Sequence, residues 1–247
     1  MARTIGGRAR QVSDYAGSRA GLATFFLHSC GAPQTQGDLY SGVAPGSSTK
    51  REIEVKLRIA DVREILSKLR KLRAISRGRV LEQNTLYDTP NSEIRRSGRL
   101  LRLRTERPAA SAWAGAGRPQ TVLTLKGPLP GRSAATAPAP FKERMEREVL
   151  VHSPQQWPSA LGSLGLRPAF RYDKYRTSFR LGDLHLDLDE TPIGVFLELE
   201  GPPAPIDRAA RLLGFSRRHY LRQSYGELYI ADCRRQGRVP RNMLFRR

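Results

Sequence analysis

The side chains best suited to chemistry in this sequence are like-charged residues that recur in pairs two positions apart. Three of the pairs are Glu-x-Glu, one is Asp-x-Asp, and two consist of Arg or Lys. They are Glu52 with Glu54, Arg102 with Arg104, Glu146 with Glu148, Lys174 with Arg176, Asp187 with Asp189, and Glu198 with Glu200. Carboxylate pairs suit hard divalent cations, which take oxygen ligands, and basic pairs suit phosphate oxygens. Together they indicate a site for a complex of a metal ion with a polyphosphate.

Alternation along each expected strand places the charged residues on one face and the apolar residues on the other. Side chains two apart in a strand point the same way, so Lys56 joins Glu52 and Glu54 on one face. Lys126 likewise lies on the polar face of its strand, and Leu123 and Leu125 lie on the other face. A solvated outer face of an ordinary antiparallel sheet would show the same alternation. Like charges on one face repel unless a counter-charge or a metal lies nearby, so the pairs favour a shared interior that holds both signs.

The periodicity of the sequence predicts eight strands between Arg51 and Cys233. They are expected at Arg51–Ile59, Val80–Asp88, Leu100–Glu106, Thr121–Lys126, Glu143–Val151, Tyr172–Arg180, Leu184–Asp189 and Gly194–Glu200. The predicted helices follow Asp61, which suits an N-cap, follow Ser153, surround Asp207–Leu213 and run from Tyr220 to Arg235. The spacing of the strands favours antiparallel pairing and therefore an α+β fold, a β-rich and barrel-like domain with a few helices.

Length and composition exclude several classes of protein. A chain of 247 residues suits one substantial domain or two small ones. No apolar run reaches the roughly 18 to 20 residues of a membrane-spanning helix, so we exclude an integral membrane protein and expect a cytoplasmic location. The only cysteines are Cys30 and Cys233, which excludes a disulfide-stapled scaffold and a Cys-rich zinc site.

The formal net charge of +20 points to an anionic ligand. Residues 1–50 carry a net +3 and residues 234–247 carry six Arg and no acid, which leaves +11 on residues 51–233. We interpret residues 1–50 as a disordered extension and residues 234–247 as a loose basic tail. The charge does not distinguish a long polymer from a small polyanion.

Nine sequence pieces in order carry a family resemblance. The first is the Glu-x-Glu-x-Lys run from Glu52 to Lys56. The others are Leu86–Thr89, Leu101–Arg104, Leu123–Pro128, Arg144–Glu148, Lys174–Arg176, Leu186–Asp189, Gly194–Glu200 and Ser224–Tyr225. In this order they resemble the CYTH domain, the family of class IV adenylyl cyclases, thiamine triphosphatases and inorganic triphosphatases, also known as triphosphate tunnel metalloenzymes. The resemblance covers about residues 51–233.

The resemblance implies a closed or nearly closed eight-stranded antiparallel barrel with charged faces inward and helices packed outside. It also implies a triphosphate substrate with Mg²⁺ or Mn²⁺. The residues implied to grip the phosphates are Lys56, Arg102, Arg104, Lys126, Lys174 and Arg176. Those implied to hold the metal or orient water are Glu52, Glu54, Glu146, Glu148, Asp187, Glu198 and Glu200. Glu52, Glu54 and Lys56 are the implied catalytic residues.

Several neighbouring residues receive a structural interpretation instead. Asp189 precedes a turn and Arg144 lies at the entry to its strand, so neither is assigned to the site. We expect His185 to be a hydrogen-bonded bystander. Ser224 and Tyr225 are expected to pack the last helix against the barrel.

Three functions are compatible with these features. We favour metal-dependent hydrolysis of a phosphoanhydride bond, in inorganic tripolyphosphate or in a nucleoside or organic triphosphate. The first alternative is a class IV adenylyl cyclase. Such an enzyme also needs a pocket for the nucleobase, and no residue of the sequence identifies one. The second is a non-catalytic binder of RNA or another polyanion, although such a binder gains nothing from so many carboxylates. We expect no membrane partner and at most weak electrostatic contact with nucleic acid; the oligomeric state is left open.

Overall fold

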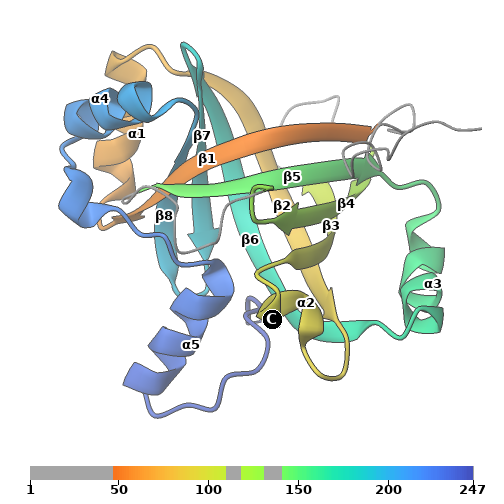
Figure 1. Cartoon of the computed structure of the whole chain (residues 1–247). Helices are drawn as coiled ribbons and strands as arrows, with labels where there is room; N and C mark the ends of the chain where they lie inside the picture. Colours follow the sequence, from red (N-terminus) through yellow and green to blue (C-terminus); the bar gives the residue numbers. More distant parts are fainter. Residues whose placement is uncertain (1–46, 110–117, 131–140, 247) are drawn as a thin grey trace, which may run out of the picture. The chain divides into compact units, whose positions relative to one another are not determined.

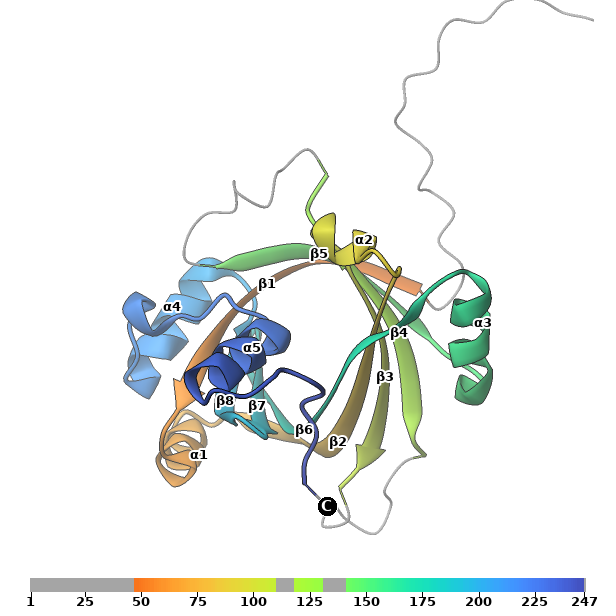
Figure 2. The same ribbon diagram turned by 90° about the horizontal axis from the view of Figure 1, so that it is seen from below.

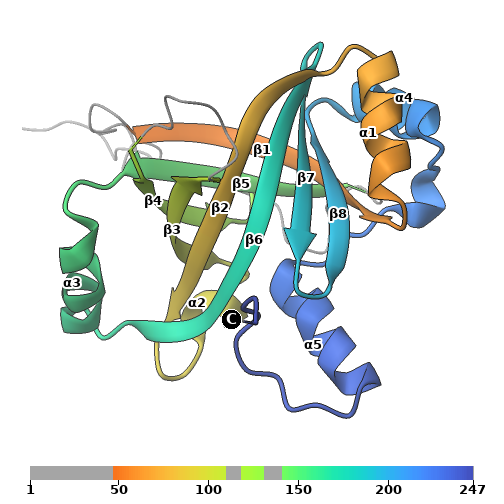
Figure 3. The same cartoon turned by 180° about the vertical axis from the view of Figure 1, so that it is seen from behind.

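Eight antiparallel strands close into a barrel in the computed structural model, which describes residues 47–109, 118–130 and 141–246. The strands follow the order β1-β5-β4-β3-β2-β6-β7-β8, and β8 pairs with β1 to close the barrel (Figures 1 and 3). They are β1 (Ser47–Ile59), β2 (Ile75–Asp88), β3 (Leu100–Pro108), β4 (Gln120–Gly127), β5 (Lys142–Leu150), β6 (Arg167–Leu181), β7 (Leu184–Thr191) and β8 (Gly194–Glu200). The predicted α+β fold with an eight-stranded antiparallel barrel is confirmed.

Helices cover the outside of the barrel and one of its ends. They are α1 (Val62–Lys71), α2 (Glu93–Arg96), α3 (Trp157–Ser163), α4 (Pro203–Leu213) and α5 (Tyr225–Arg235), with 3-10 turns at Pro154–Gln156 and Arg217–His219. α1 and α4 lie side by side against β1, β7 and β8, whereas α5 lies across one end of the barrel (Figure 2). Asp61 caps α1 as predicted, because its Oδ1 accepts hydrogen bonds from the N–H groups of Arg63 and Glu64.

Apolar side chains point outward from the strands and form the main core with the helices. Leu57 of β1 and the leucines of β7 and β8 pack against Leu69 of α1 and Ile206 of α4. All of these side chains are buried. Because faces alternate along a strand, the charged residues of the same strands point into the barrel. The hydrophobic core of this protein therefore lies outside the barrel, between strands and helices.

The start of α5 differs from the prediction. The helix begins at Tyr225 rather than Tyr220, because Leu221 is held to β1 by two main-chain hydrogen bonds to Lys56, of 2.8 and 3.2 Å. Ser224 then caps the helix. Short-range periodicity could not reveal this pairing, since it joins positions far apart in the chain.

The segment after α5 also differs from the prediction. Met243 is only 1% exposed and pairs with β6 in parallel: its N–H donates to the carbonyl of Arg171 (2.9 Å) and its carbonyl accepts from the N–H of Asp173 (3.0 Å). The ring of Phe245 packs against Tyr175. The expectation of a loose tail is therefore wrong for this segment.

Two further expectations concern the ends of the chain and the membrane. The disorder expected for residues 1–50 lies outside the described residues up to position 46, and β1 already begins at Ser47. Within the described ranges, no helix has the length and apolar character needed to cross a membrane.

Gly201, at the end of β8, provides a test of the packing between β8 and the β6–β7 hairpin. Its φ is +149°, and a Cβ added there would lie 2.6 Å from Cδ2 of the buried Leu184. We predict that Gly201→Ala lowers the free energy of unfolding by about 2 kcal/mol, from backbone strain and overpacking. Urea denaturation measures the change.

Gly162 is the matched control. It lies within α3 and a Cβ there meets nothing within 4 Å, so Gly162→Ala should stabilise the protein by roughly 0.5 to 1 kcal/mol. Equal effects of the two substitutions would contradict the close approach at Gly201.

Candidate functional site

The inward-facing side chains of the strands enclose a cavity of about 630 Å³ inside the barrel. All the residues that the sequence analysis assigned to the site line this cavity. They are Glu52, Glu54, Lys56, Arg102, Arg104, Lys126, Glu146, Glu148, Lys174, Arg176, Asp187, Glu198 and Glu200. Strand alternation and barrel closure bring them together, while their roles in binding and chemistry stay predictions.

The register of neighbouring strands places opposite charges next to one another across the cavity wall. The directly opposed pairs include Glu54 with Lys142, Lys56 with Glu198, Glu82 with Lys174, Lys126 with Glu146, and Arg176 with Asp189. Cross-strand pairs of opposite charge are stabilising. These neighbours offset part of the repulsion within the like-charged pairs, although Glu54 lies opposite Glu200 and Asp187 opposite Glu198.

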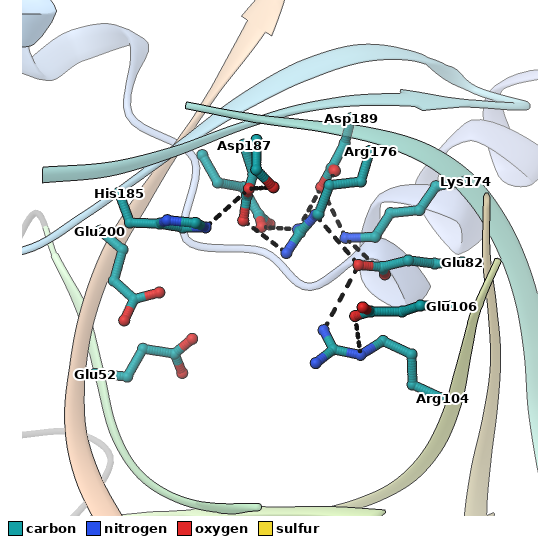
Figure 4. Close-up of polar contacts among 12 residues, drawn as sticks. Glu52, Glu82, Arg104, Glu106, Lys174, Arg176, His185, Asp187, Asp189 and Glu200 are labelled. Atoms are coloured by element: carbon teal, nitrogen blue, oxygen red, sulfur yellow. Dashed lines mark hydrogen bonds and ion pairs between the residues drawn. The ribbon is translucent and has the colours of Figure 1, made fainter. Parts of the chain in front are cut away.

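Arg176 is the centre of one charge cluster (Figure 4). Its guanidinium contacts Asp187 (Nη1–Oδ2, 2.7 Å), Asp189 (Nε–Oδ1, 2.7 Å) and Glu198, and its Nε lies 3.4 Å from Oε1 of Glu82. Although burial alone would lower the pKa of Arg176, these carboxylates raise it well above its ordinary value. The guanidinium therefore remains charged inside the barrel.

Glu82 is an interior carboxylate that the sequence analysis missed. It is 0% exposed and lies 3.3 Å from Nζ of Lys174 and 3.6 Å from Nη1 of Arg104. Burial would raise the pKa of Glu82, but Arg176, Lys174 and Arg104 hold it well below its ordinary value. The sequence signal for Glu82 was its position two residues from the polar Asn84, on the same face of β2. It was missed because no second carboxylate lies two positions away.

Tyr225 brings α5 into the cavity. Its hydroxyl donates a 2.6 Å hydrogen bond to Oδ2 of Asp189, and its ring centroid lies 4.5 Å from Nζ of Lys56 and 5.0 Å from Nζ of Lys174. The same ring packs edge-on against Phe196. Tyr225 therefore packs the helix as predicted and, beyond that prediction, contacts the charged interior. Asp189, which was left unassigned, belongs to this cluster.

Arg102 and Arg104 form a second cluster on the β3–β4–β5 wall. Arg104 contacts Glu148 through Nη2 (3.3 Å) and Glu106 through Nε (3.0 Å). Arg102 reaches the same Glu148 at 3.6 Å and donates to the hydroxyl of Thr124. Both guanidinium groups face the cavity, where their donors suit phosphate oxygens.

Glu52 and Glu54 are neighbours on β1 with opposite pKa shifts. Burial would raise the pKa of Glu54, but Lys142, 2.7 Å away, and Lys56 lower it to about 2. Burial raises the pKa of Glu52, and the opposing effect of Lys126, at 2.6 Å, does not cancel it. Glu54 therefore stays ionised under most conditions, whereas Glu52 takes up a proton more readily.

Two residues that the sequence analysis did not assign to the site also line the cavity. His185 contacts Oδ1 of Asp187 through Nε2 at 3.0 Å (Figure 4), and this hydrogen bond raises the pKa of His185. The expectation of a hydrogen-bonded histidine agrees with this geometry. Arg144 faces the cavity opposite Glu52.

Carboxylates suited to a metal ion gather on the wall formed by β1, β5 and β8. Glu52 and Glu146 contact Nζ of Lys126 at 2.6 and 2.9 Å, and Glu146 and Glu200 contact Nζ of Lys50 at 3.5 and 2.9 Å. With the lysines between them, no three Asp, Glu, His or Cys side chains of the described residues already form a metal cluster. Their oxygen donors fit Mg²⁺ or Mn²⁺.

Comparisons with known proteins agree with this architecture. The sequence model of the CYTH domain matches residues 50–213. The chain is similar in structure to the PH1819 protein of Pyrococcus horikoshii OT3, with a TM-score of 0.60 and 23% identity over 73% of this chain and 99% of that one. It is also similar to a candidate adenylate cyclase from Vibrio parahaemolyticus, with a TM-score of 0.54 and 19% identity over 72% of this chain and 96% of that one. No curated protein matches the sequence.

The role of Glu82 as a buried counter-charge can be tested through stability. Glu82→Gln removes the carboxylate from between three cations, and an uncompensated buried charge is costly. We predict a loss of about 3 kcal/mol in the free energy of unfolding, measured by urea denaturation at neutral pH.

Glu106→Gln is the matched control for this substitution. The side chain of Glu106 is 29% exposed and pairs with Arg104, which keeps Glu148 as a partner. Its loss should cost less than about 1 kcal/mol. Equal stability of the Glu82 variant and the unmodified protein would show that Glu82 does not balance the cations.

Proposed function

The chain belongs to the CYTH domain family, and on that premise we propose that it is a metal-dependent enzyme that hydrolyses a triphosphate bound inside the barrel. The observation that carries the proposal is the convergence of both signs of charge on one cavity. Six cations suited to phosphate oxygens share the cavity with seven carboxylates suited to a metal or to water. A polyanion binder would have no use for those carboxylates.

Charge balance inside the barrel supports a substrate that arrives together with a metal. The cavity lining holds eleven Lys or Arg and nine Asp or Glu, so it is close to neutral without a ligand. A triphosphate brings about four negative charges at neutral pH. Against a lining with two more cations than carboxylates, this leaves an excess of about two negative charges. A buried excess of negative charge is unfavourable, and a divalent cation bound with the substrate would offset it.

The cations would hold the phosphate chain from several sides. Lys56 and Lys174 approach from the α5 end, Arg176 from β6, and Arg102 and Arg104 from β3. In the free protein each of these groups contacts a carboxylate or a hydroxyl. Binding would exchange these contacts for phosphate oxygens. The rigid barrel keeps the cations in position, so little reorganisation is needed when charge develops during the reaction.

The residues that would hold Mg²⁺ or Mn²⁺ are the carboxylates implied by the family, foremost Glu146 and Glu200 on the β1–β5–β8 wall, while Glu52 on the same wall would handle the proton of the attacking water. When bound, the metal would supply positive charge that stabilises phosphate oxygens and the leaving group. Lys50 and Lys126 would give up part of their contacts with these carboxylates.

Hydrolysis requires a water molecule to attack the terminal phosphorus in line with the bond that breaks. The new bond joins the water oxygen to phosphorus, the phosphoanhydride P–O bond breaks, and its electron pair leaves with the diphosphate. A carboxylate must accept the proton of the water. Glu52 is suited to this role because its pKa is raised, whereas Glu54, with a pKa of about 2, is a weaker base.

The substrate and the metal can be tested in one assay. We expect the purified protein to release orthophosphate from tripolyphosphate in the presence of Mg²⁺ or Mn²⁺, and to lose this activity when EDTA removes the metal. Formation of cyclic AMP and pyrophosphate from ATP would instead identify a class IV adenylyl cyclase. Polyanion binding that falls steeply with salt, without turnover, would support the non-catalytic alternative.

The role of Glu52 can be tested by its pH profile. We predict that Glu52→Gln lowers kcat by about 100-fold or more, because the proton acceptor is lost. Glu52 acts in its ionised form, so the activity of the unmodified protein should fall as the pH drops through the raised pKa of this group. The residual activity of the variant should lack that acidic limb.

Glu190→Gln is the control for this prediction. Glu190 lies on the outer face of β7, where it pairs with Arg79, so it should leave kcat and the pH profile unchanged. Full activity of the Glu52 variant would contradict the assignment of the proton acceptor.

A further inference from the structure

The two ends of the barrel cavity differ in how they are lined. At the α5 end, Tyr225 and Tyr172 border the cavity and are buried. The opposite end, which we call the hairpin end, is formed by the start of β2 and the β6–β7 hairpin (residues 75–80 and 178–187). There Arg77 and Arg180 border the same cavity and are exposed to solvent. The two arginines therefore connect the interior with the outside.

Arg77 reaches the cavity because of a β-bulge. Ser76 of β2 pairs with Phe179 and Gly78 pairs with Ser178, so Arg77 is the extra residue between two successive pairs. Gly78 has a φ of +114°, a backbone conformation that favours glycine. Bulges redirect side chains, and this one places Arg77 at the rim of the cavity.

The positive charge of the two arginines is not neutralised by neighbouring carboxylates. Within the described part of the chain Arg77 makes no hydrogen bond or ion pair, and the Nε of Arg180 donates to the main-chain carbonyl of Gly182 at 2.7 Å. Among the described residues, Glu200 pairs with Lys50, Asp187 pairs with Arg176, and no ion pair joins Asp183 of the β6–β7 turn to either arginine. The hairpin end therefore offers two guanidinium groups without a carboxylate partner among the described residues, unlike the interior.

The position of the pair fits a ligand that continues beyond a bound triphosphate. Arg180 is four residues past Arg176 on β6, on the same face, which is about 13 Å along the strand. A chain held by Arg176 and the other interior cations would pass Arg77 and Arg180 on its way out. Arginine binds phosphate oxygens with a planar fork of donors.

The lining of the hairpin end favours phosphates over a nucleobase. Base stacking relies on aromatic side chains. Among the described residues, the Phe, Tyr and Trp that border the cavity are Tyr172 and Tyr225, both toward α5. A ligand that leaves through the hairpin end thus meets cations and no Phe, Tyr or Trp ring of the described residues; the one imidazole there, His185, is hydrogen-bonded to Asp187.

We propose that Arg77 and Arg180 form a subsite for the phosphates beyond the third in a linear inorganic polyphosphate. This inference rests on the proposed function, since it assumes that a triphosphate unit occupies the interior. It makes the substrate class a polyphosphate chain, which leaves the barrel at the hairpin end.

The experiment compares ligands that differ by one phosphate. Isothermal titration calorimetry on the full chain carrying Glu52→Gln, which slows the proposed hydrolysis, would give Kd with Mg²⁺ present for tripolyphosphate, tetrapolyphosphate and a triphosphate-ended RNA oligonucleotide. The arginine substitutions are compared in this same background. We expect tetrapolyphosphate to bind about 5-fold or more tightly than tripolyphosphate. In the Arg77→Gln, Arg180→Gln double variant this ratio should fall below about 2-fold, with the Kd for tripolyphosphate nearly unchanged.

Arg79→Gln is the matched control, because Arg79 lies on the same strand but outside the barrel, where it pairs with Glu190 and stacks on Tyr175. It should keep the unmodified ratio. An unchanged ratio in the double variant, or an equal loss for both polyphosphates, would overturn the subsite. An RNA affinity that depends on the two arginines as strongly as that of tetrapolyphosphate would overturn the ligand class.

Parallel turnover assays separate this inference from the proposed function. Arginine-dependent preference for tetrapolyphosphate without any hydrolysis would support the subsite and reject the hydrolase. Hydrolysis of tripolyphosphate without an arginine-dependent preference for the longer chain would reject the subsite and support the hydrolase.

Discussion

The structure depends on the mutual neutralisation of opposite charges that a closed barrel withdraws from bulk water. Unpaired buried charges are costly, and Glu82 and Lys174 are almost completely buried within 3.3 Å of each other. The strand register makes this possible, because Lys56 lies opposite Glu198 and Lys126 opposite Glu146. A slip of one residue would turn every charged side chain into the apolar layer outside. Charge pairing and the hydrophobic effect therefore select the same register.

The same pairing makes the interior suitable for ligand exchange. Each interior cation is already held in place by a carboxylate, so a phosphate oxygen can replace the carboxylate without moving the cation far. A metal ion in turn can replace lysine beside the carboxylates of β1, β5 and β8. The cavity thus suits a ligand of mixed charge, and a bare polyanion would leave the carboxylates uncompensated.

The C-terminal part of the chain completes the site from outside the sheet. α5 places Tyr225 against Lys56, Lys174 and Asp189, and the pairing of Met243 with β6 holds the following segment near the same end. The opposite end has no comparable cover in the described residues and carries Arg77 and Arg180. The two ends of the cavity are therefore distinct: one is covered by α5 and the other is open to solvent beside the two arginines.

The sequence by itself determined the strand pattern, the α+β class and which residues share a face of each strand, because alternation with a period of two is local information. Glu52, Glu54 and the basic pairs were recognisable for that reason. That the charged face points inward was an expectation from the like-charged pairs and the family resemblance, and barrel closure decided it. Only the tertiary structure decided which charges become partners. Glu82, Tyr225 and the packed segment around Met243 acquire their places through contacts between positions remote in the chain, and barrel closure and helix docking set those contacts, which no local period encodes.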